Sequence, residues 1–224
     1  MGEKGMRAFL PHLAEQGVKV DMVLVGEPTS MQAATAERGL VVLDCTANGK
    51  SGHAARNEGE NAIYKAMCDI EKLRNYRFDR TSEQLGDIKI TVTQISAGTQ
   101  HNIVPDECRF VADVRTTDAY SNEEVVEILQ SVVECDAKPR STRVRASAIS
   151  LNHPLVEAAT AIGRTTFVSP TTSDRAIMQG LPALKMGVGE SSRSHTADEF
   201  VLVSEVEEGV AIYQQLLDEL KNRL

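Results

Sequence analysis

The sequence predicts an α/β protein that carries an inserted α+β unit. Strand-like and helix-like segments alternate at both ends of the chain, the middle follows the order β-α-β-β-α-β, and apolar residues make up 42% of the 224 residues. The order β-α-β-β-α-β is that of a ferredoxin-like sandwich, and about 100 residues are a normal size for a domain. We therefore expect one domain formed by residues 1–37 and 149–224, interrupted by a second domain at 38–148.

The first part of the outer domain is expected to be a helix followed by a buried strand. Apolar residues recur at helical spacing from Glu3 to about Gln16, and the run Met22–Val25 predicts a strand. The strand leads into the turn GEPT, which contains Glu27. Catalytic groups often lie where a buried strand stops, but Glu27 taken alone is better explained as an exposed turn carboxylate.

Six segments support the inserted unit. GLVVLDCTANG predicts a strand and NAIYKAMCDIEKLRNY an amphipathic helix. DIKITVTQIS and ECRFVADVRT alternate between apolar and polar residues, as strands with one solvent-exposed face do. SNEEVVEILQSVVE begins with Ser121 and Glu124 in the register of a capping box, and TRVRASAIS predicts the last strand of the unit.

Helices and strands alternate again after the inserted unit. HPLVEAATAIGRT predicts a helix, TTFVSPTTSDRAIMQG a strand and loop followed by a helix, and LPALKMGVGE a strand. The final helix is expected to begin at Ser204, with Glu207 as its capping partner. The apolar side of this amphipathic helix is predicted to consist of Val206, Val210, Tyr213, Leu217 and Leu220.

Charge and composition argue against several classes of protein. The net charge of −8 and the pI of about 5.2 argue against a nucleic-acid-binding protein, which needs a basic face. No apolar run approaches the roughly 18 residues of a membrane helix, and no GxxxxGK[ST] or GxGxxG motif indicates a nucleotide site. The four cysteines form no CxxC pair, which favours free thiols in a reducing compartment, so the cytoplasm is the expected location.

The polar residues that helices and strands leave unexplained lie in five loops. These are GEPT at 26–29, GKSGHAAR at 49–56, AGTQHNIVP at 97–105, TTSD at 171–174 and SSRSHTADE at 191–199. In this order they resemble the zinc-dependent acetylornithine deacetylases, succinyl-diaminopimelate desuccinylases and aminoacylase-like carboxypeptidases, and most of all the N-acyl-ornithine deacylases. The resemblance implies the C-terminal part of a mixed-sheet zinc-hydrolase catalytic domain, with an inserted lid domain through which two copies form a homodimer.

The resemblance implies a metal site and an oxyanion site. Glu27 would bind one metal ion and His195 the other, with zinc expected and cobalt or manganese as substitutes. His53 would cross the dimer and stabilise the oxyanion in the partner's site, and Asn102 would donate to the substrate or the oxyanion. Without the resemblance, His53 is better explained as a surface histidine in a glycine-rich turn.

Three further residues would bind the substrate. Arg115 would hold the α-carboxylate of an N-acyl-amino acid, for which the guanidinium fork is suited. Ser173 and Asp174 would line the pocket. Arg115 also has another explanation, as an exposed strand arginine paired with Asp113 or Glu107.

The resemblance also indicates parts of the family's site that this sequence lacks. In the family an H-x-D motif and an adjacent Glu-Glu pair precede the GEPT strand, whereas here only MGEKG precedes the first helix. We therefore expect an N-terminally truncated chain. Since a zinc site needs at least three protein ligands, the chain by itself is expected to bind zinc weakly or not at all and to hydrolyse nothing measurable.

The leading hypothesis is metal-dependent hydrolysis of an N-acyl-amino acid, N-acetyl- or N-succinyl-ornithine of arginine biosynthesis, by the complete enzyme. The alternative is a non-catalytic dimerisation and binding module. A serine hydrolase that uses Ser51 or Ser194 is disfavoured because the sequence has no GxSxG motif. A succinyl group adds one carboxylate to the substrate, and the cations available to bind it are Lys50, Arg56 and Arg193.

Overall fold

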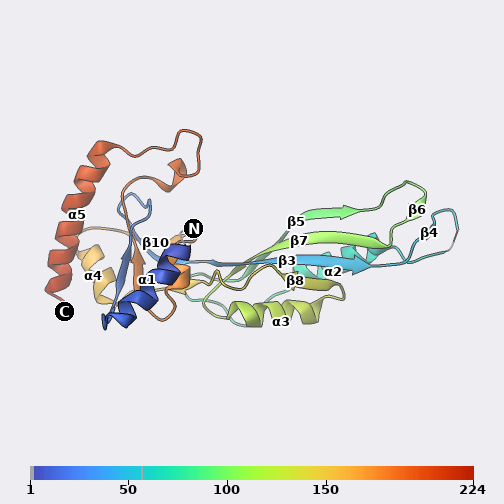
Figure 1. Ribbon diagram of the computed structural model, residues 1–224, viewed down its shortest axis with the longest axis horizontal. Coiled ribbons are helices and arrows are strands. Elements are labelled where there is room, and N and C mark those ends of the chain that lie inside the picture. The colour runs from blue at the N-terminus through green and yellow to red at the C-terminus, as the bar shows by residue number, and fades with distance from the viewer. Residues whose placement is uncertain (1–2, 57) are drawn as a thin grey trace. The chain divides into compact units, whose positions relative to one another are not determined.

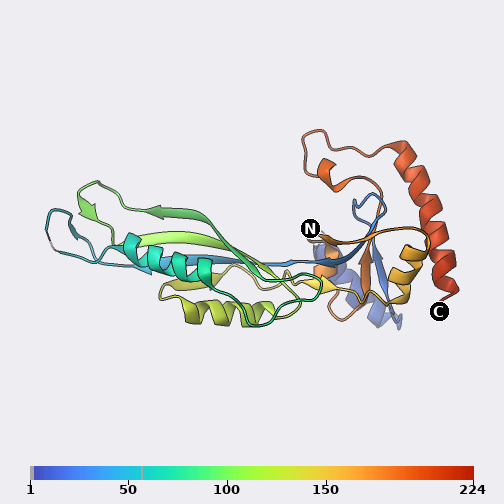
Figure 2. The ribbon, with the colours of Figure 1, turned by 180° about the vertical axis from the view of Figure 1, so that it is seen from behind.

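The computed structural model describes residues 3–56 and 58–224, which divide into two compact units. Unit 1 comprises Met1–Arg38 and Ala146–Leu224, and unit 2 comprises Gly39–Arg145. Figures 1 and 2 show the elements of each unit from opposite sides. Each unit has its own buried core, so each is described by itself.

Unit 2 is a ferredoxin-like sandwich of two helices on a four-stranded antiparallel sheet. The strand order β5-β7-β3-β8 places the first and third strands of the unit at the centre, as this fold requires. The two helices cover the same face of the sheet, the near face in Figure 2. The elements are β3 (Gly39–Asn48), α2 (Ala62–Asn75), β5 (Lys89–Ala97), β7 (Glu107–Thr116), α3 (Asn122–Val132) and β8 (Asp136–Pro139).

The core of unit 2 follows from the alternation in its sequence. Every second residue of β7 is buried, from Cys108 to Thr116, while the residues between them are exposed or half-buried. Helix α3 begins at the predicted capping box. The Ser121 hydroxyl accepts from the Glu124 N–H at 3.1 Å, and the Glu124 carboxylate accepts from the Ser121 N–H at 2.7 Å.

The fourth strand of unit 2 is not the predicted one. Asp136–Pro139 pairs with β3, whereas the segment TRVRASAIS supplies one bridge from Val144 to Leu40 and a short strand in unit 1, β9 (Ser147–Ala148). The prediction was wrong because the residues DAKP, with two charges and a proline, have the composition of a loop. At the edge of a sheet a strand tolerates proline, since the missing N–H faces outwards.

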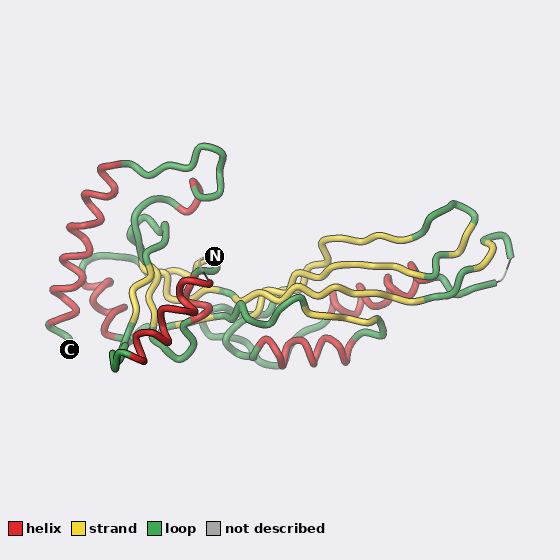
Figure 3. The backbone as a smooth tube through the Cα atoms, in the orientation of Figure 1, coloured by secondary structure: helices red, strands yellow, loops and turns green. Residues whose placement is uncertain are grey.

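A two-stranded ribbon extends unit 2 at one end of its sheet. Its strands are β4 (Gly52–His53) and β6 (Ile103–Val104), which loops connect to β3 and β5 (Figure 3). Glycine is required beneath this ribbon because the chain doubles back on itself. A Cβ at Gly52 would lie 2.5 Å from the Glu58 carbonyl oxygen.

Unit 1 contains a mixed sheet in the order β1-β11-β2-β10, with β9 also paired to β2. β2 was not predicted, because its residues AATAE include three alanines and a glutamate and only one residue that favours strands, Thr35, yet all five are buried. The strands are β1 (Val23–Val25), β2 (Ala33–Glu37), β10 (Thr166–Ser169) and β11 (Ala183–Lys185). The helices are α1 (Glu3–Glu15), α4 (Pro154–Ala161), α5 (Val203–Lys221) and the 3₁₀ turns η1 (Asp174–Ile177) and η2 (Ser191–Arg193).

Helix α5 buries a side that coincides with the predicted one only at Leu220 and the half-buried Tyr213. Its buried residues are Gly209, Ile212, Leu216 and Leu220. Three members of the predicted stripe are exposed, namely Val206, Val210 and Leu217. Gly209 accounts for the difference. A Cβ at this position would clash with a methyl group of Val188. Because residue 209 is glycine, this side of the helix can pack closely against the loop that follows β11. None of the described helices has the length and apolar character of a membrane span.

The first turn of α5 is organised by Glu205 and not by the predicted pair of Ser204 and Glu207. The Glu205 carboxylate accepts from the Leu202 N–H at 2.9 Å and from the guanidinium of Arg193 at 2.8 Å. Arg193, together with Leu202, holds the pKa of Glu205 at about 2, below its ordinary value of 4.5. Glu205 therefore ties the loop that precedes the helix to the helix itself.

The packing at Gly209 can be tested by adding one methyl group. We expect Gly209→Ala to lower the free energy of unfolding by about 1–2 kcal/mol, because the overpacking cost exceeds the gain in helix propensity. Urea unfolding followed by circular dichroism measures the change. The double variant Gly209→Ala/Val188→Ala should regain part of the loss, and a single variant as stable as the parent chain would contradict this packing.

The tie between Glu205 and Arg193 should depend on pH. Because the folded-state pKa of Glu205 is lower than its ordinary value, the tie is complete above about pH 4.5 and is lost as the pH falls towards 2. Over this range, amide hydrogen exchange in residues 191–196, corrected for intrinsic rates, should lose protection.

Glu205→Gln should reproduce this loss at neutral pH, with exchange roughly five-fold faster, as expected for a bidentate pair at the surface. Glu207→Gln is the matched control, since Glu207 is an exposed carboxylate on the same helix. Equal exchange in the Glu205 and Glu207 variants would refute the role of Glu205.

Candidate functional site

Glu27 is held by a turn whose backbone is locked against the end of β11. The Met186 N–H donates to the Val25 carbonyl oxygen at 2.9 Å, and the Gly187 N–H donates to the Thr29 hydroxyl at 3.0 Å. A Cβ at Gly187 would lie 2.6 Å from the Glu27 carbonyl oxygen, so only glycine permits this approach. The Glu27 side chain is half-buried.

His195 lies in the loop between η2 and α5 and has an unusual backbone conformation. Its φ is 60°, in the left-handed region that few residues other than glycine adopt. The Glu199 carboxylate accepts from the His195 N–H at 3.1 Å, and Arg193 anchors the preceding 3₁₀ turn through its ion pairs with Glu190 at 3.2 Å and with Glu205. The loop thus holds an exposed imidazole on a backbone that three carboxylates help to fix.

The turn of Glu27 and the loop of His195 line one cavity of unit 1, with a volume of about 250 Å³. Its walls include Pro28, the neighbour of Glu27, and Ser194, the neighbour of His195. Glu27 and His195 are 168 residues apart in the sequence (195 minus 27), and their loops line the same cavity. Sequence reasoning paired them only by resemblance, and the fold brings their loops together.

These two residues by themselves do not fit a zinc centre. A zinc site in a protein uses at least three protein ligands. Within residues 3–56 and 58–224, no group of three or more His, Cys, Asp or Glu side chains is placed so that it could hold a metal ion. Glu27 and His195 therefore supply at most part of a metal site.

Ser173 is buried, and its side chain is bound to Glu37. The Ser173 hydroxyl donates to Glu37 Oε2 at 2.8 Å, and the Ser173 N–H donates to Glu37 Oε1 at 3.1 Å. Asp174, the first residue of η1, is half-buried. Through Ser173, the loop that carries Asp174 is attached to the end of β2.

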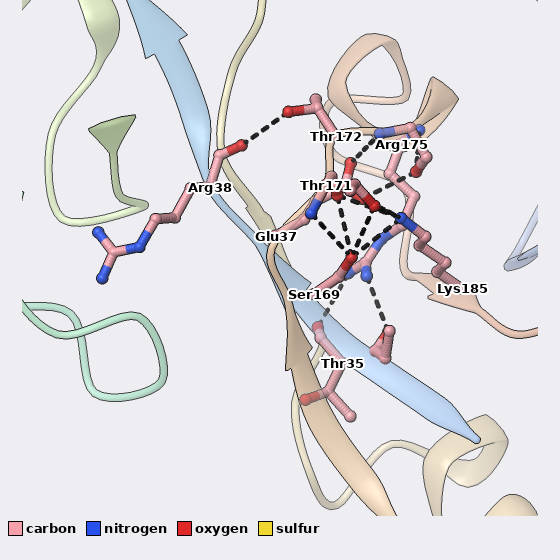
Figure 4. A network of polar contacts seen from close by, with 10 residues as sticks. Thr35, Glu37, Arg38, Ser169, Thr171, Thr172, Arg175 and Lys185 are labelled. Carbon is pink, nitrogen blue, oxygen red and sulfur yellow. Dashed lines mark hydrogen bonds and ion pairs between the residues drawn. The ribbon is translucent and has the colours of Figure 1, made fainter. Parts of the chain in front are cut away.

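Glu37 belongs to a buried charge cluster with Lys185 and Arg175, shown in Figure 4. Lys185 Nζ lies 3.8 Å from Glu37 Oε2 and donates to the Ser169 hydroxyl at 3.0 Å. The Arg175 guanidinium donates to the carbonyl oxygens of β2, at 2.9 Å each. Burial lowers the pKa of Lys185 and of Arg175, and the charge of Glu37 opposes both shifts.

This cluster was not predicted, because its three charged residues lie far apart in the sequence. A signal was present in β2 and β11: each places one charged residue, Glu37 or Lys185, in a short apolar or small-residue strand. A charge inside a buried strand must be paired or hydrogen-bonded. The opposite signs of the two residues make them natural partners.

His53 and Asn102 lie together on the ribbon of unit 2. His53 pairs with Ile103, the neighbour of Asn102, and the Ala54 N–H donates to the Asn102 carbonyl oxygen at 3.0 Å. The Ala55 N–H donates to His53 Nδ1 at 3.1 Å. With Nδ1 acting as an acceptor, the proton of the neutral imidazole is on Nε2, so this exposed ring offers an N–H donor.

Arg115 lies at the opposite end of the same sheet. Its Nε and one terminal nitrogen donate to the two carboxylate oxygens of Asp113 at 2.7 and 3.0 Å. The ribbon adjoins the Glu107 end of β7, and Arg115 is near the other end of that strand. At about 3.3 Å per residue, Glu107 and Arg115 are roughly 26 Å apart. One copy of unit 2 therefore does not bring Arg115 to the same small molecule as His53 and Asn102.

Comparison with known proteins identifies relatives for both units. Residues 35–141 match the peptidase dimerisation domain of the M20 family. The chain is 27% identical to the succinyl-diaminopimelate desuccinylase of Wolbachia pipientis wMel, over 99% of this chain and 60% of the relative. It is 28% identical to that of Dinoroseobacter shibae, over 95% and 62%. The chain thus spans about 60% of the length of the curated relatives it matches.

Solved structures share the fold over nearly the whole chain. Aminopeptidase PepT of Bacillus cereus superposes with a TM-score of 0.77 at 20% identity, over 99% of this chain and 63% of the other. The YxeP protein of Bacillus subtilis, described as a dinuclear metal-binding peptidase of the M20 family, superposes with a TM-score of 0.65 at 19% identity, over 96% and 60%. These matches confirm the predicted fold class and the predicted resemblance to the succinyl-diaminopimelate desuccinylases. Residues 35–141 thus match a peptidase dimerisation domain of the M20 family, and the chain as a whole is similar to the succinyl-diaminopimelate desuccinylases and shares the fold of solved M20 peptidases.

Proposed function

We propose that this chain is part of a homodimeric, metal-dependent hydrolase that cleaves the amide bond of an N-acyl-amino acid. The loop resemblance favours N-acetyl- or N-succinyl-ornithine as the substrate. The names of the relatives, which are succinyl-diaminopimelate desuccinylases, favour a succinyl group. Because the chain spans about 60% of their length, the activity is proposed for the complete protein.

The separation of two residue sets in unit 2 carries this proposal. His53 and Asn102 lie on the ribbon, which adjoins the Glu107 end of β7, and Arg115 lies roughly 26 Å from Glu107 along that strand. Two such sets cannot serve one small substrate from a single copy. In a dimer, the two sets can bind one substrate together, with His53 and Asn102 coming from the ribbon of one protomer and Arg115 coming from the other protomer.

The available donors suit amide hydrolysis. His53 offers its Nε2–H, and Asn102 lies beside it, so both can stabilise the charge that develops on the carbonyl oxygen. Arg115 uses two of its five N–H groups on Asp113 and retains three for a substrate carboxylate. Asp113 thereby holds the guanidinium in one orientation.

We assign the dimer contact to helix α2 and strand β5. Strand β5 is an edge strand, with one row of backbone N–H and C=O groups unpaired within its sheet. Tyr64 and Met67 on α2, and Ile95 on β5, are each more than half exposed. Exposed apolar side chains beside an open strand edge are typical of a surface that pairs with another chain.

This assignment predicts that Met67→Lys gives a monomer. The new charge would be buried in the contact, whereas in the free protomer the side chain remains exposed and folding is undisturbed. Light scattering coupled to size-exclusion chromatography measures the mass. Glu127→Lys, an exposed position on α3, is the control and should remain dimeric. A dimeric Met67→Lys protein would contradict the assignment.

The proposed activity predicts a difference between two neighbouring histidines. In the longest protein that the gene encodes, loaded with zinc and assayed with both N-acylornithines, His53→Ala should lower kcat by roughly 100-fold, as the loss of an oxyanion donor does. His101→Ala is the matched control, because His101 is also exposed and lies beside Asn102. Equal effects of the two substitutions would refute the role of His53.

The alternative is a dimerisation and binding module without chemistry, which is favoured by the lack of three neighbouring metal ligands among the described residues. For the 224-residue chain by itself we expect little or no bound zinc by plasma metal analysis and no turnover. The hypotheses differ in the complete protein: hydrolysis of an N-acylornithine supports the enzyme, and a metal-loaded dimer without turnover supports the module.

A further inference from the structure

We propose that Arg56 determines the acyl specificity of this protein, by binding the second carboxylate of an N-succinyl substrate. An N-acetyl substrate has no such group and gains nothing from Arg56. This inference rests on the proposed function, since it assigns a substrate class to the site that His53 serves.

Arg56 belongs to the same turn as His53. The Arg56 N–H donates to the His53 carbonyl oxygen at 2.9 Å, which closes a turn of four residues. In such a turn the Cα atoms of the first and fourth residues lie within about 7 Å of each other, so a substrate whose carbonyl oxygen is held by the His53 imidazole comes within the span of a long side chain at Arg56. In a succinyl group the second carboxylate is only two methylene groups beyond that carbonyl, within reach of a long arginine side chain.

The guanidinium of Arg56 is available to a ligand. Its side chain is 68% exposed, and its ion pair is with Glu58 at 3.7 Å, beyond hydrogen-bond distance. A guanidinium can bind a carboxylate through two parallel N–H donors, which gives both affinity and orientation. Arg56 is therefore chemically suited to bind a terminal carboxylate.

Arg193, the second candidate cation, is already bound. Its guanidinium pairs with Glu205 and with Glu190 at 3.2 Å, and it lies 4.8 Å from the centre of the Phe200 ring. Its side chain is only 16% exposed. A substrate carboxylate would have to displace two protein carboxylates, so Arg193 is a structural tie and not a binding group.

Lys50, the third candidate, is paired with Glu60 through its backbone. Its N–H and carbonyl oxygen exchange hydrogen bonds with the backbone of Glu60 at 2.8 and 2.9 Å. Lys65, and to a lesser extent Lys50, holds the pKa of Glu60 below its ordinary value. Lys50 is also an odd number of residues from His53 along an extended segment, which places the two side chains on opposite faces.

The experiment compares two substrates on the metal-loaded complete protein. The measured quantity is the ratio of kcat/KM for N-succinylornithine to kcat/KM for N-acetylornithine. For Arg56→Met this ratio should fall roughly ten- to hundred-fold, mostly through the KM of the succinyl substrate, since a charge-assisted bidentate pair is lost. Arg56→Lys, which keeps the charge but not the fork, should lie between Arg56→Met and the parent protein.

Two matched variants control for charge and position. Arg74→Met removes an arginine of similar exposure, 78%, with a similarly long ion pair of 3.8 Å to Glu71, from a helix of the same unit. Lys50→Met removes the competing cation of the ribbon. Both should leave the ratio within two-fold of the parent protein, and thermal unfolding should show no change for any variant, because all three side chains are exposed.

The outcomes separate this inference from the proposed function. A ratio that falls for Arg56→Met alone supports the inference. If the parent protein hydrolyses both substrates and the ratio is insensitive to Arg56, or falls for Lys50→Met instead, the assignment of Arg56 is overturned and the hydrolase stands. If the parent protein hydrolyses neither substrate, the proposed function fails and the inference fails with it.

Discussion

The proposed chemistry depends on the pairing of β3 with β7. Ten consecutive residues of each strand are in register, from Gly39 opposite Thr116 to Asn48 opposite Glu107. Central strands paired on both sides resist bending, since each backbone group is held by a neighbour. The two paired strands therefore keep a fixed distance between their ends. They hold the ribbon with His53 at one end and Arg115 near the other, and in the proposed function this separation is the reason for assigning the two to different protomers of one site.

Unit 1 depends on a different constraint, the burial of Glu37. This carboxylate has no exposed surface, so its charge must be paired or hydrogen-bonded inside the protein. Ser173 donates a hydrogen bond to it and Lys185 forms an ion pair with it, and both residues come from segments that are distant from Glu37 in the sequence. In doing so they tie the loop of Asp174 to β2 and β11. A loop of serines and threonines, whose residues by themselves favour no single conformation, is thereby fixed against these two strands.

The parts of the fold that could be predicted are those that near neighbours in the chain determine. The capping box of Ser121 and Glu124 spans four residues, and the alternation of β7 repeats every two. Both patterns are complete within one element, so sequence reasoning found them. Strand β2 is different: its small and polar residues form a strand because β11 and β10 pair on either side of it. The buried side of α5 was predicted only in part for a similar reason, since the packing of Gly209 against Val188, from another segment, determines which side of the helix is buried.

The sequence by itself determined the class of fold, the inserted unit and the five polar loops, because these follow from local periodicity and from short motifs. It also limited the cation for a second substrate carboxylate to Lys50, Arg56 and Arg193. Only the tertiary structure distinguishes their surroundings, through contacts that no spacing rule encodes, such as the salt bridge of Arg193 with Glu205. Likewise, only the register of β3 and β7 decided that His53 and Arg115 of one protomer are too far apart to share a substrate. Distances of this kind are set by how elements pair and pack, and those pairings join residues that the chain order keeps apart.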